Sequence, residues 1–239
     1  MTAAAPPQAG PLPLVLVPAL LCDDALFRPA LDALDASGAR VDARVMVAPH
    51  HDMARNVAEI LERAPDRFVL AGASYGGTVA IDVALAAPER VAGLWLTGCD
   101  PGAHKAASLG LAAGLTAAPD ATIGHLAGVV VRPGASQADA AFRAMAARVG
   151  GHVGAAQARA LAGRDDAWDR LGTLAMPALL LWGEDDAAIP VDVGRRLAGA
   201  LPRARLEVIP ECGHLPALER PAETAVVAGG WLAQFGRGG

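Results

Sequence analysis

The sequence predicts an α/β fold: a mostly parallel sheet with helices on both faces and an inserted helical cap. Short apolar runs alternate with segments of helical spacing, which is the pattern of strands joined by helical crossovers. The runs are almost entirely apolar, as strands of a parallel sheet are when both faces are buried. One long stretch, 101–174, breaks the alternation because it has helical spacing and no convincing strand.

Six apolar runs have the length and composition of strands, in chain order Leu14–Val17, Val41–Val47, Phe68–Ala71, Val91–Thr97, Ala178–Trp182 and Arg205–Ile209. Segments with helical spacing separate most of them, at roughly Ala25–Ser37, Met53–Ala64, Tyr75–Ala86, Pro190–Leu201 and Ala222–Phe235. Because a helical crossover returns the chain to the same edge of a sheet, we expect these strands to be parallel.

The stretch 101–174 consists of alanine-rich segments interrupted by glycine and proline. It can be a cap inserted into the core or a bundle packed on the sheet. The cap is favoured because one strand ends at Thr97 and the next begins near Ala178. We therefore assign 1–100 and 175–239 to the core and 101–174 to the cap. The apolar composition of the cap predicts an apolar chamber, and Arg164 is a candidate for an ion pair between cap and core.

Composition excludes several classes of protein. The 239 residues fit one domain of ordinary size, and an apolar content of 53% excludes wholesale disorder. A net charge of −5 gives no indication of a nucleic-acid partner or of binding to an anionic membrane. The expected partner is a small-molecule substrate with an apolar moiety, and the oligomeric state is left open between a monomer and a homodimer.

The cysteines and the N-terminal segment indicate a cytoplasmic protein. Cys22, Cys99 and Cys212 are too few and too widely spaced for a disulfide framework or a zinc site. No histidine pair has metal-ligand spacing with carboxylates nearby, so we expect no metal and no cofactor. Met1 to Gly10 lacks a basic segment before an apolar run and is a poor secretion signal. The apolar run Leu12–Leu21 is too short to cross a bilayer.

The most informative motif is Gly72-Ala73-Ser74-Tyr75-Gly76, which follows a strand and precedes a helix. In this context a serine lies on a tight strand-to-helix turn, and the glycines are needed because larger side chains would collide. The turn exposes the serine hydroxyl above the sheet and directs the first amides of the helix to the same place. Ser74 is therefore the candidate nucleophile.

A serine hydroxyl needs a base, and His214 is the favoured one of six histidines. It follows the last predicted strand, so its loop can reach the carboxyl edge where Ser74 is expected. His50 and His51 follow the second strand and are interpreted as loop residues, one of which could line a substrate entrance. Three further histidines lie in the cap region, where they could face the cavity or solvent: His104, His125 and His152.

The base in turn needs a carboxylate to orient it. Glu184, Asp185 and Asp186 follow a predicted strand and precede Pro190. Their position favours Asp186, with Asp185 as the second candidate and Glu184 as the third. Asp100 follows the strand after the Ser74 helix and could also reach the histidine, but it ranks below Asp186.

An oxyanion needs two preorganised donors. The amide of Tyr75, at the start of the helix, is one candidate. The other is expected in the loop after the first strand, where the amide of Leu20 is preferred. Cys22 in that loop has no adjacent base in the sequence and is interpreted as a packing residue.

From about Leu14 to Trp231 the chain resembles the α/β-hydrolase superfamily, with particular similarity to the small bacterial branch of 3-oxoadipate enol-lactonases and related esterases. The resemblance lies in residues 16–23, 70–80, 87–91, 157–166, 181–186 and 213–221. It implies Ser74 as nucleophile, His214 as base and Asp186 as acid, with the amides of Leu20 and Tyr75 as the oxyanion hole.

The chain departs from many relatives at two positions. Pro18-Ala19 stands where they carry His-Gly, and Tyr75 stands where many have Met. The Tyr75 side chain is therefore expected to line the pocket, with its hydroxyl within reach of a substrate.

The order Ser74, Asp186, His214 along the chain is the order of α/β-hydrolases. It predicts a serine hydrolase that cleaves a carboxylic ester, a lactone or a thioester through an acyl-enzyme. Because the superfamily also includes lyases and ligand receptors, two alternatives stay open. One is a lyase or cyclising enzyme that uses the same three residues as acid and base, and the other is a slow ligand-sensing protein.

Overall fold

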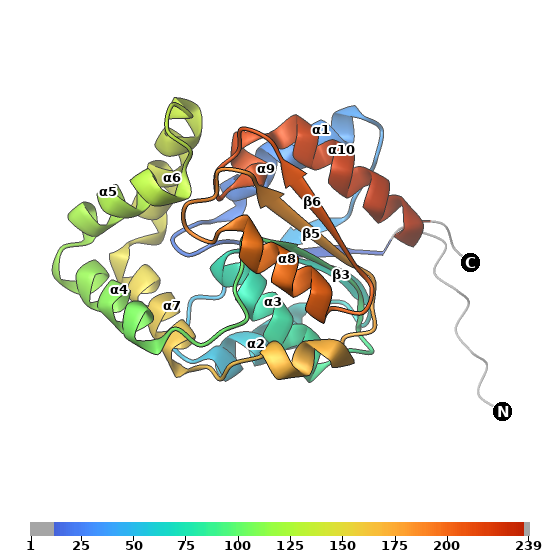
Figure 1. Cartoon of the computed structure of the whole chain (residues 1–239), viewed down its shortest axis with the longest axis horizontal. Coiled ribbons are helices and arrows are strands. Elements are labelled where there is room, and N and C mark those ends of the chain that lie inside the picture. The colour runs from blue at the N-terminus through green and yellow to red at the C-terminus, as the bar shows by residue number, and fades with distance from the viewer. Residues whose placement is uncertain (1–11, 237–239) are drawn as a thin grey trace.

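The computed structural model describes residues 12–236, and it contains a six-stranded parallel sheet in the order β2-β1-β3-β4-β5-β6 (Figure 1). The strands are β1 (Leu14–Val17), β2 (Ala43–Val45), β3 (Phe68–Ala73), β4 (Val91–Thr97), β5 (Ala178–Gly183) and β6 (Ala204–Ile209). All five pairings in the sheet are parallel. The predicted fold class is confirmed. The segment Met1–Gly10, which was judged a poor secretion signal, lies outside the described residues.

Helices cover both faces of the sheet. On one face lie α2 (Met53–Arg63), α3 (Tyr75–Ala86) and α8 (Val191–Ala200), whose apolar side chains share a buried cluster with β3 and β4. On the other face lie α1 (Arg28–Ala36) and α10 (Pro221–Leu232), which pack on each other and on the strands. Burial of both faces explains why β1, β3 and β5 are apolar at every position.

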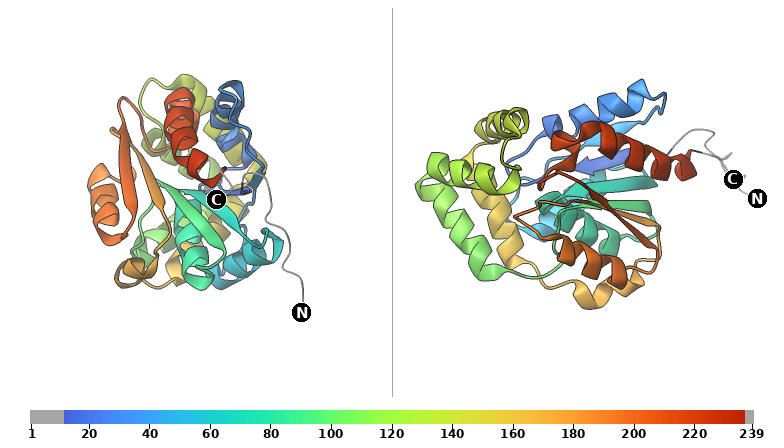
Figure 2. Two further views of the ribbon diagram at one scale, coloured as in Figure 1. Left: turned by 90° about the vertical axis from the view of Figure 1, so that its right-hand side faces the viewer. Right: turned by 45° about the horizontal axis from the view of Figure 1, so that its top comes forward.

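Four helices lie together at one end of the molecule (Figures 1 and 2): α4 (Lys105–Ala117), α5 (Pro119–Val130), α6 (Ser136–Val149) and α7 (Gly151–Gly163). The 3₁₀ segment η2 (Trp168–Thr173) follows them but packs on α3 and α8 of the core. The described helical layer at this end therefore stops near Gly163, about ten residues before the expected boundary at 174. No helix in the described range is long and apolar enough to cross a membrane.

The order of the strands places a topological switch between β1 and β3. After β1 the chain moves outward to β2 and then returns past β1 to form β3, from which it continues in the opposite direction. Loops that leave β1 and β3 at their carboxyl ends therefore diverge, and the crevice between them is where open parallel sheets bind ligands. The loop with Leu20 follows β1, and Ser74 follows β3.

Candidate active site

Ser74 occupies a strained turn between β3 and α3. Its backbone has φ 52° and ψ −118°, a conformation that non-glycine residues rarely adopt. The Ser74 amide donates to the carbonyl oxygen of Thr97 at 2.7 Å, which ties the turn to the end of β4. The serine is only partly buried, and its side chain lines a cavity.

The glycines of the motif are required by close backbone approaches. A Cβ on Gly72 would lie 2.7 Å from the Cα of Gly77, and one on Gly76 would lie 2.5 Å from the carbonyl oxygen of Pro18. The Ser74 turn therefore packs directly against the loop that follows β1. These contacts give the physical reason for the glycine pattern seen in the sequence.

The structure brings His214 and Asp186 together. Nδ1 of His214 lies 2.8 Å from Oδ2 of Asp186, and both side chains are almost completely buried. The other carboxylate oxygen of Asp186 accepts the amides of Ala188 and Ile189 at 2.9 and 2.8 Å. With one oxygen fixed by the backbone, the second is held towards the imidazole, which selects the tautomer protonated on Nδ1.

Gly98 packs against this pair. A Cβ on Gly98 would be 2.8 Å from the His214 ring and 3.2 Å from Oδ2 of Asp186. Gly98 also lines the same cavity as Ser74. Within the described residues no hydrogen bond joins the Ser74 hydroxyl to His214, and such contacts often tighten only when substrate binds.

The other acidic candidates have different partners. Asp185 forms an exposed ion pair with Arg132, with 2.7 Å between its Oδ2 and Nε of the arginine. Glu184 is exposed. Asp100 does not pair with His214; its carboxylate contacts Nε2 of His104 at 2.8 Å and accepts the amide of Gly102 at 2.7 Å.

The loop after β1 contains a tight turn. The Cys22 amide donates to the Ala19 carbonyl oxygen at 3.0 Å, and Leu21 has φ 63°. A turn in which only the third residue has a positive φ is a type II turn. In this turn the Leu20 amide belongs to the same peptide as the Ala19 carbonyl and points the opposite way. Among the described residues neither the Leu20 amide nor the Tyr75 amide has a hydrogen-bond acceptor.

Cys22 is completely buried, and burial raises the pKa of its thiol, with a further contribution from the Asp23 carboxylate. A thiol with a raised pKa is a poor nucleophile, which agrees with its interpretation as a packing residue.

The expectation for the Tyr75 side chain is wrong in one respect. Tyr75 does line the cavity, but its hydroxyl points into the core. There it donates to the carbonyl oxygen of Ala48 at 2.9 Å and accepts from the side-chain amide of Asn56 at 3.0 Å. With both partners supplied by the protein, this hydroxyl is not free for a substrate.

The cavity beside Ser74 has a volume of about 100 Å³. Its apolar walls include Leu161 of α7 and Ile189. Asp100 and His104 also line it, so one side of the cavity is polar. Of the other expected histidines, His50 lies outside this lining and contacts Glu59, with 2.6 Å between Nε2 and Oε2.

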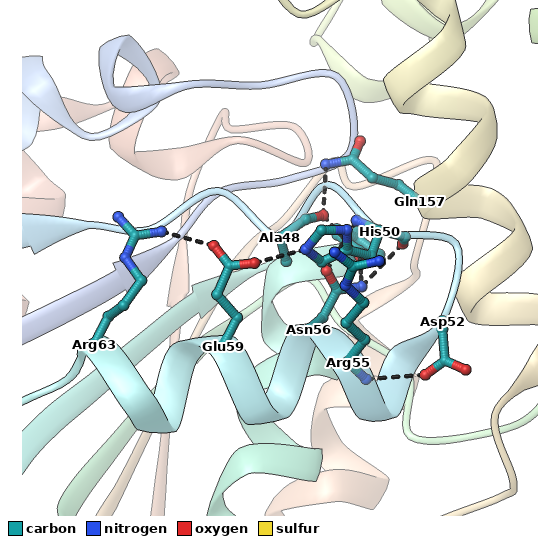
Figure 3. Close-up of polar contacts among 9 residues, drawn as sticks. Ala48, His50, Asp52, Arg55, Asn56, Glu59, Arg63 and Gln157 are labelled. Carbon is teal, nitrogen blue, oxygen red and sulfur yellow. Dashed lines mark hydrogen bonds and ion pairs between the residues drawn. The ribbon is translucent and has the colours of Figure 1, made fainter.

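Two residues near the site were missed by the sequence analysis. Gln157 on α7 and Asn56 on α2 are both buried, and both make hydrogen bonds to the segment Ala48–His50 after β2 (Figure 3). The available signal was a polar residue at a helix position surrounded by small apolar ones, as with Gln157 between Ala155 and Ala158.

Comparison with known proteins agrees with the observed fold. A model of the alpha/beta hydrolase family matches residues 14–227. RutD of Variovorax paradoxus, which bears the name of a carbamate hydrolase, is 34% identical over 192 residues, or 74% of this chain and 70% of the relative. A 2-hydroxy-6-oxononadienedioate/2-hydroxy-6-oxononatrienedioate hydrolase of Cupriavidus pinatubonensis is 43% identical over 49 residues. That match spans only 20% of this chain and 17% of the relative.

Solved structures share the fold over nearly the whole chain. A thermophilic esterase from Thermogutta terrifontis superposes with a TM-score of 0.83 at 23% identity, covering 96% of this chain and 92% of the other. The enol-lactonase from Burkholderia xenovorans gives a TM-score of 0.78 at 18% identity, with 95% and 92% covered. The chain belongs to the alpha/beta hydrolase family.

Proposed function

We propose that this enzyme hydrolyses a carboxylic ester, a lactone or a thioester through an acyl-enzyme on Ser74. The observation that carries the proposal is the buried His214–Asp186 pair. Gly98 packs against this pair and also lines the cavity that contains Ser74. A positioned imidazole held by a carboxylate is the base that a serine nucleophile requires.

In the proposed reaction, Oγ of Ser74 attacks the substrate carbonyl while Nε2 of His214 accepts the hydroxyl proton. The carbonyl oxygen becomes an oxyanion, held by the amides of Leu20 and Tyr75. His214 then donates its proton to the leaving oxygen or sulfur, and the acyl group stays on Ser74. Water attacks this acyl group with His214 again as base, the acid is released and the serine regains its proton.

The size of the cavity supports a small acyl group. About 100 Å³ is well below the 300–1,000 Å³ of typical drug-sized sites. The names of relatives, a carbamate hydrolase and an enol-lactonase, are consistent with small substrates that carry an activated carbonyl. The three described cysteines are free and buried, which supports a reducing compartment such as the cytoplasm.

The test is covalent labelling. A fluorophosphonate should label the wild-type enzyme once, on Ser74, and the Ser74→Ala variant should not react. In a panel of p-nitrophenyl esters, acetate and butyrate should be cleaved faster than octanoate, and Ser74→Ala should release no burst of nitrophenol. Labelling at another residue, or undiminished ester cleavage by Ser74→Ala, contradicts the proposal and supports acid–base chemistry without an acyl-enzyme.

A further inference from the structure

We propose that Gln157, a residue of the cap helix α7, positions the oxyanion hole by holding the turn that presents the Leu20 amide. The inference deepens the proposed function and rests on it. Gln157 is fully buried, and its side chain joins two loops that follow different strands. It acts through the turn and not on the substrate, so it is a positioning residue.

The turn at residues 19–22 is unfavourable for the residue at its third position. In a type II turn this position is usually glycine, because φ must be positive. Here it is Leu21, whose φ is 63° and whose side chain is fully buried. The alternative type I turn would remove the strain on Leu21 and would rotate the peptide between Leu20 and Leu21 by about half a turn. The Leu20 amide lies on the preceding peptide, so this rotation would not reverse it but would loosen the turn that holds it in place. Something must therefore stabilise the observed turn.

Gln157 supplies that stabilisation. Its Oε1 accepts the Leu21 amide at 3.0 Å, which is possible only with the peptide in the type II orientation. The same helix also holds the Leu21 side chain, because a Cβ on Gly154 would lie 2.9 Å from its Cγ. Both ends of the strained residue are thus fixed by α7. In the rotated turn the Gln157 oxygen would face a carbonyl, and the buried Leu21 amide would lose its acceptor.

The side-chain amide nitrogen of Gln157 connects the turn at residues 19–22 to the residue that follows Ser74. Nε2 of Gln157 donates to the carbonyl oxygen of Ala48 at 3.3 Å (Figure 3). The same carbonyl accepts the hydroxyl of Tyr75 at 2.9 Å. Tyr75 carries the second expected oxyanion donor on its own backbone. The Ala48 carbonyl oxygen therefore links the side chain of Gln157 to the side chain of Tyr75.

The experiment compares Gln157→Met with the wild type. Methionine has nearly the same shape but makes neither hydrogen bond. We expect the acylation rate constant for p-nitrophenyl acetate to fall about 10- to 100-fold, less than the loss of a whole oxyanion donor, with KM changed less than threefold. The Ki of a trifluoromethyl ketone, which forms an oxyanion with the serine, should rise by the same factor as the rate falls.

Arg90→Met is the control for a loss of stability. Arg90 donates to the carbonyl oxygens of Leu61, Ala64, Pro65 and Asp66, and in the described part of the chain it has no hydrogen bond to Leu21, Ala48 or Tyr75. We expect Arg90→Met to lower Tm while it leaves the acylation rate and the ketone Ki within threefold of wild type. If Gln157→Met does not fold, Gln157→Ala, which keeps a strong helix former on α7, is measured in its place with the same expectation.

The outcomes separate the inference from the proposed function. If wild type is labelled at Ser74 and the Gln157 variant acylates within twofold of wild type, the inference fails and the function stands. If both variants lose rate and Tm in proportion, Gln157 is only structural and the inference also fails. If the wild type forms no acyl-enzyme at all, the proposed function itself is wrong.

Discussion

At the scale of single residues, the two neighbouring carboxylates Asp185 and Asp186 have opposite environments. Asp186 is buried against His214, whereas Asp185 is exposed and pairs with Arg132. We expect Asp186→Asn to lower kcat about 10⁴-fold, because an amide cannot hold the imidazole in the required tautomer. Its oxygen can still accept the amides of Ala188 and Ile189, so the fold should persist. Steady-state kinetics with circular dichroism test this.

Asp185→Asn is the natural control for that substitution. It removes only an exposed ion pair, for which we expect a change in stability of less than about 1 kcal/mol and a kcat near wild type. A large loss of kcat in Asp185→Asn, with little effect of Asp186→Asn, would show that Asp185 and not Asp186 orients the histidine.

Glycines allow a second test at this scale. A Cβ on Gly76 would overlap the backbone at Val17 and Pro18, so Gly76→Ala should destabilise the fold by about 1–3 kcal/mol or more and displace the Leu20 loop. Gly128 is exposed on α5 with nothing within 4 Å of its would-be Cβ, so Gly128→Ala should stabilise by up to about 1 kcal/mol. Urea unfolding of both variants measures the contrast, and equal effects would show that backbone contact is not the cause.

The candidate site residues that could be predicted from the sequence are those marked by a local sequence pattern. Ser74 is marked by its glycines, and His214 and Asp186 by loops that directly follow strands. Gln157 was missed because its bond to Leu21 joins positions 136 residues apart, and such a contact leaves no local periodicity. The Tyr75 hydroxyl was misplaced for the same reason: its direction depends on Ala48, in a loop 27 residues away.

At the scale of elements, strand and helix positions followed the apolar pattern closely, and the differences have local causes. The second strand was expected over Val41–Val47 but β2 has three residues, because it is an edge strand paired only with the short β1. The first helix was expected from Ala25 and instead divides into η1 (Asp24–Leu26) and α1. Pro29 lies in the first turn of α1, where its missing N–H costs nothing.

An ion pair between elements gives a pH-dependent prediction. Asp23, at the start of η1, accepts Nε of Arg148 on α6 at 2.7 Å and also the Ala25 amide. The bond from Arg148 holds the pKa of the Asp23 carboxyl below its usual value, against the opposing effect of partial burial. A lowered pKa means that the stabilisation is complete above the unfolded value of about 3.9 and is lost as the pH falls through the folded value.

We therefore expect Arg148→Gln to destabilise the protein only slightly at pH 7, since the arginine is exposed. The difference from wild type should shrink below about pH 4. Urea unfolding at several pH values measures it, with Arg195→Gln, an exposed pair within α8, as the control. A difference that grows in acid would contradict the assigned role of Asp23.

At the scale of the whole molecule, the cap is joined to the core by a buried arginine. The expected ion pair of Arg164 is present, and its partner is Asp82 on α3, with both contacts at 3.1 Å. The arginine also donates to the carbonyl oxygens of Pro101 and Gly102 at 2.7 and 3.2 Å, where the chain leaves the core for the cap. The Arg164 side chain, which is 2% exposed, therefore joins the first residues of the 101–163 segment to the residue that follows its last helix.

We expect Arg164→Met to lower the free energy of unfolding by about 3–5 kcal/mol, because Asp82 and two carbonyl groups would lose their buried partner. The exposed pair of Arg143 with Asp139 lies within one helix, so Arg143→Gln should have little effect on the free energy of unfolding. The double variant Arg164→Met/Asp82→Leu should recover part of the loss, because it removes the uncompensated charge together with its partner. Chemical unfolding of the four proteins decides the point: a double variant no more stable than Arg164→Met would mean that the lost carbonyl contacts, and not the stranded carboxylate, dominate the attachment of the cap.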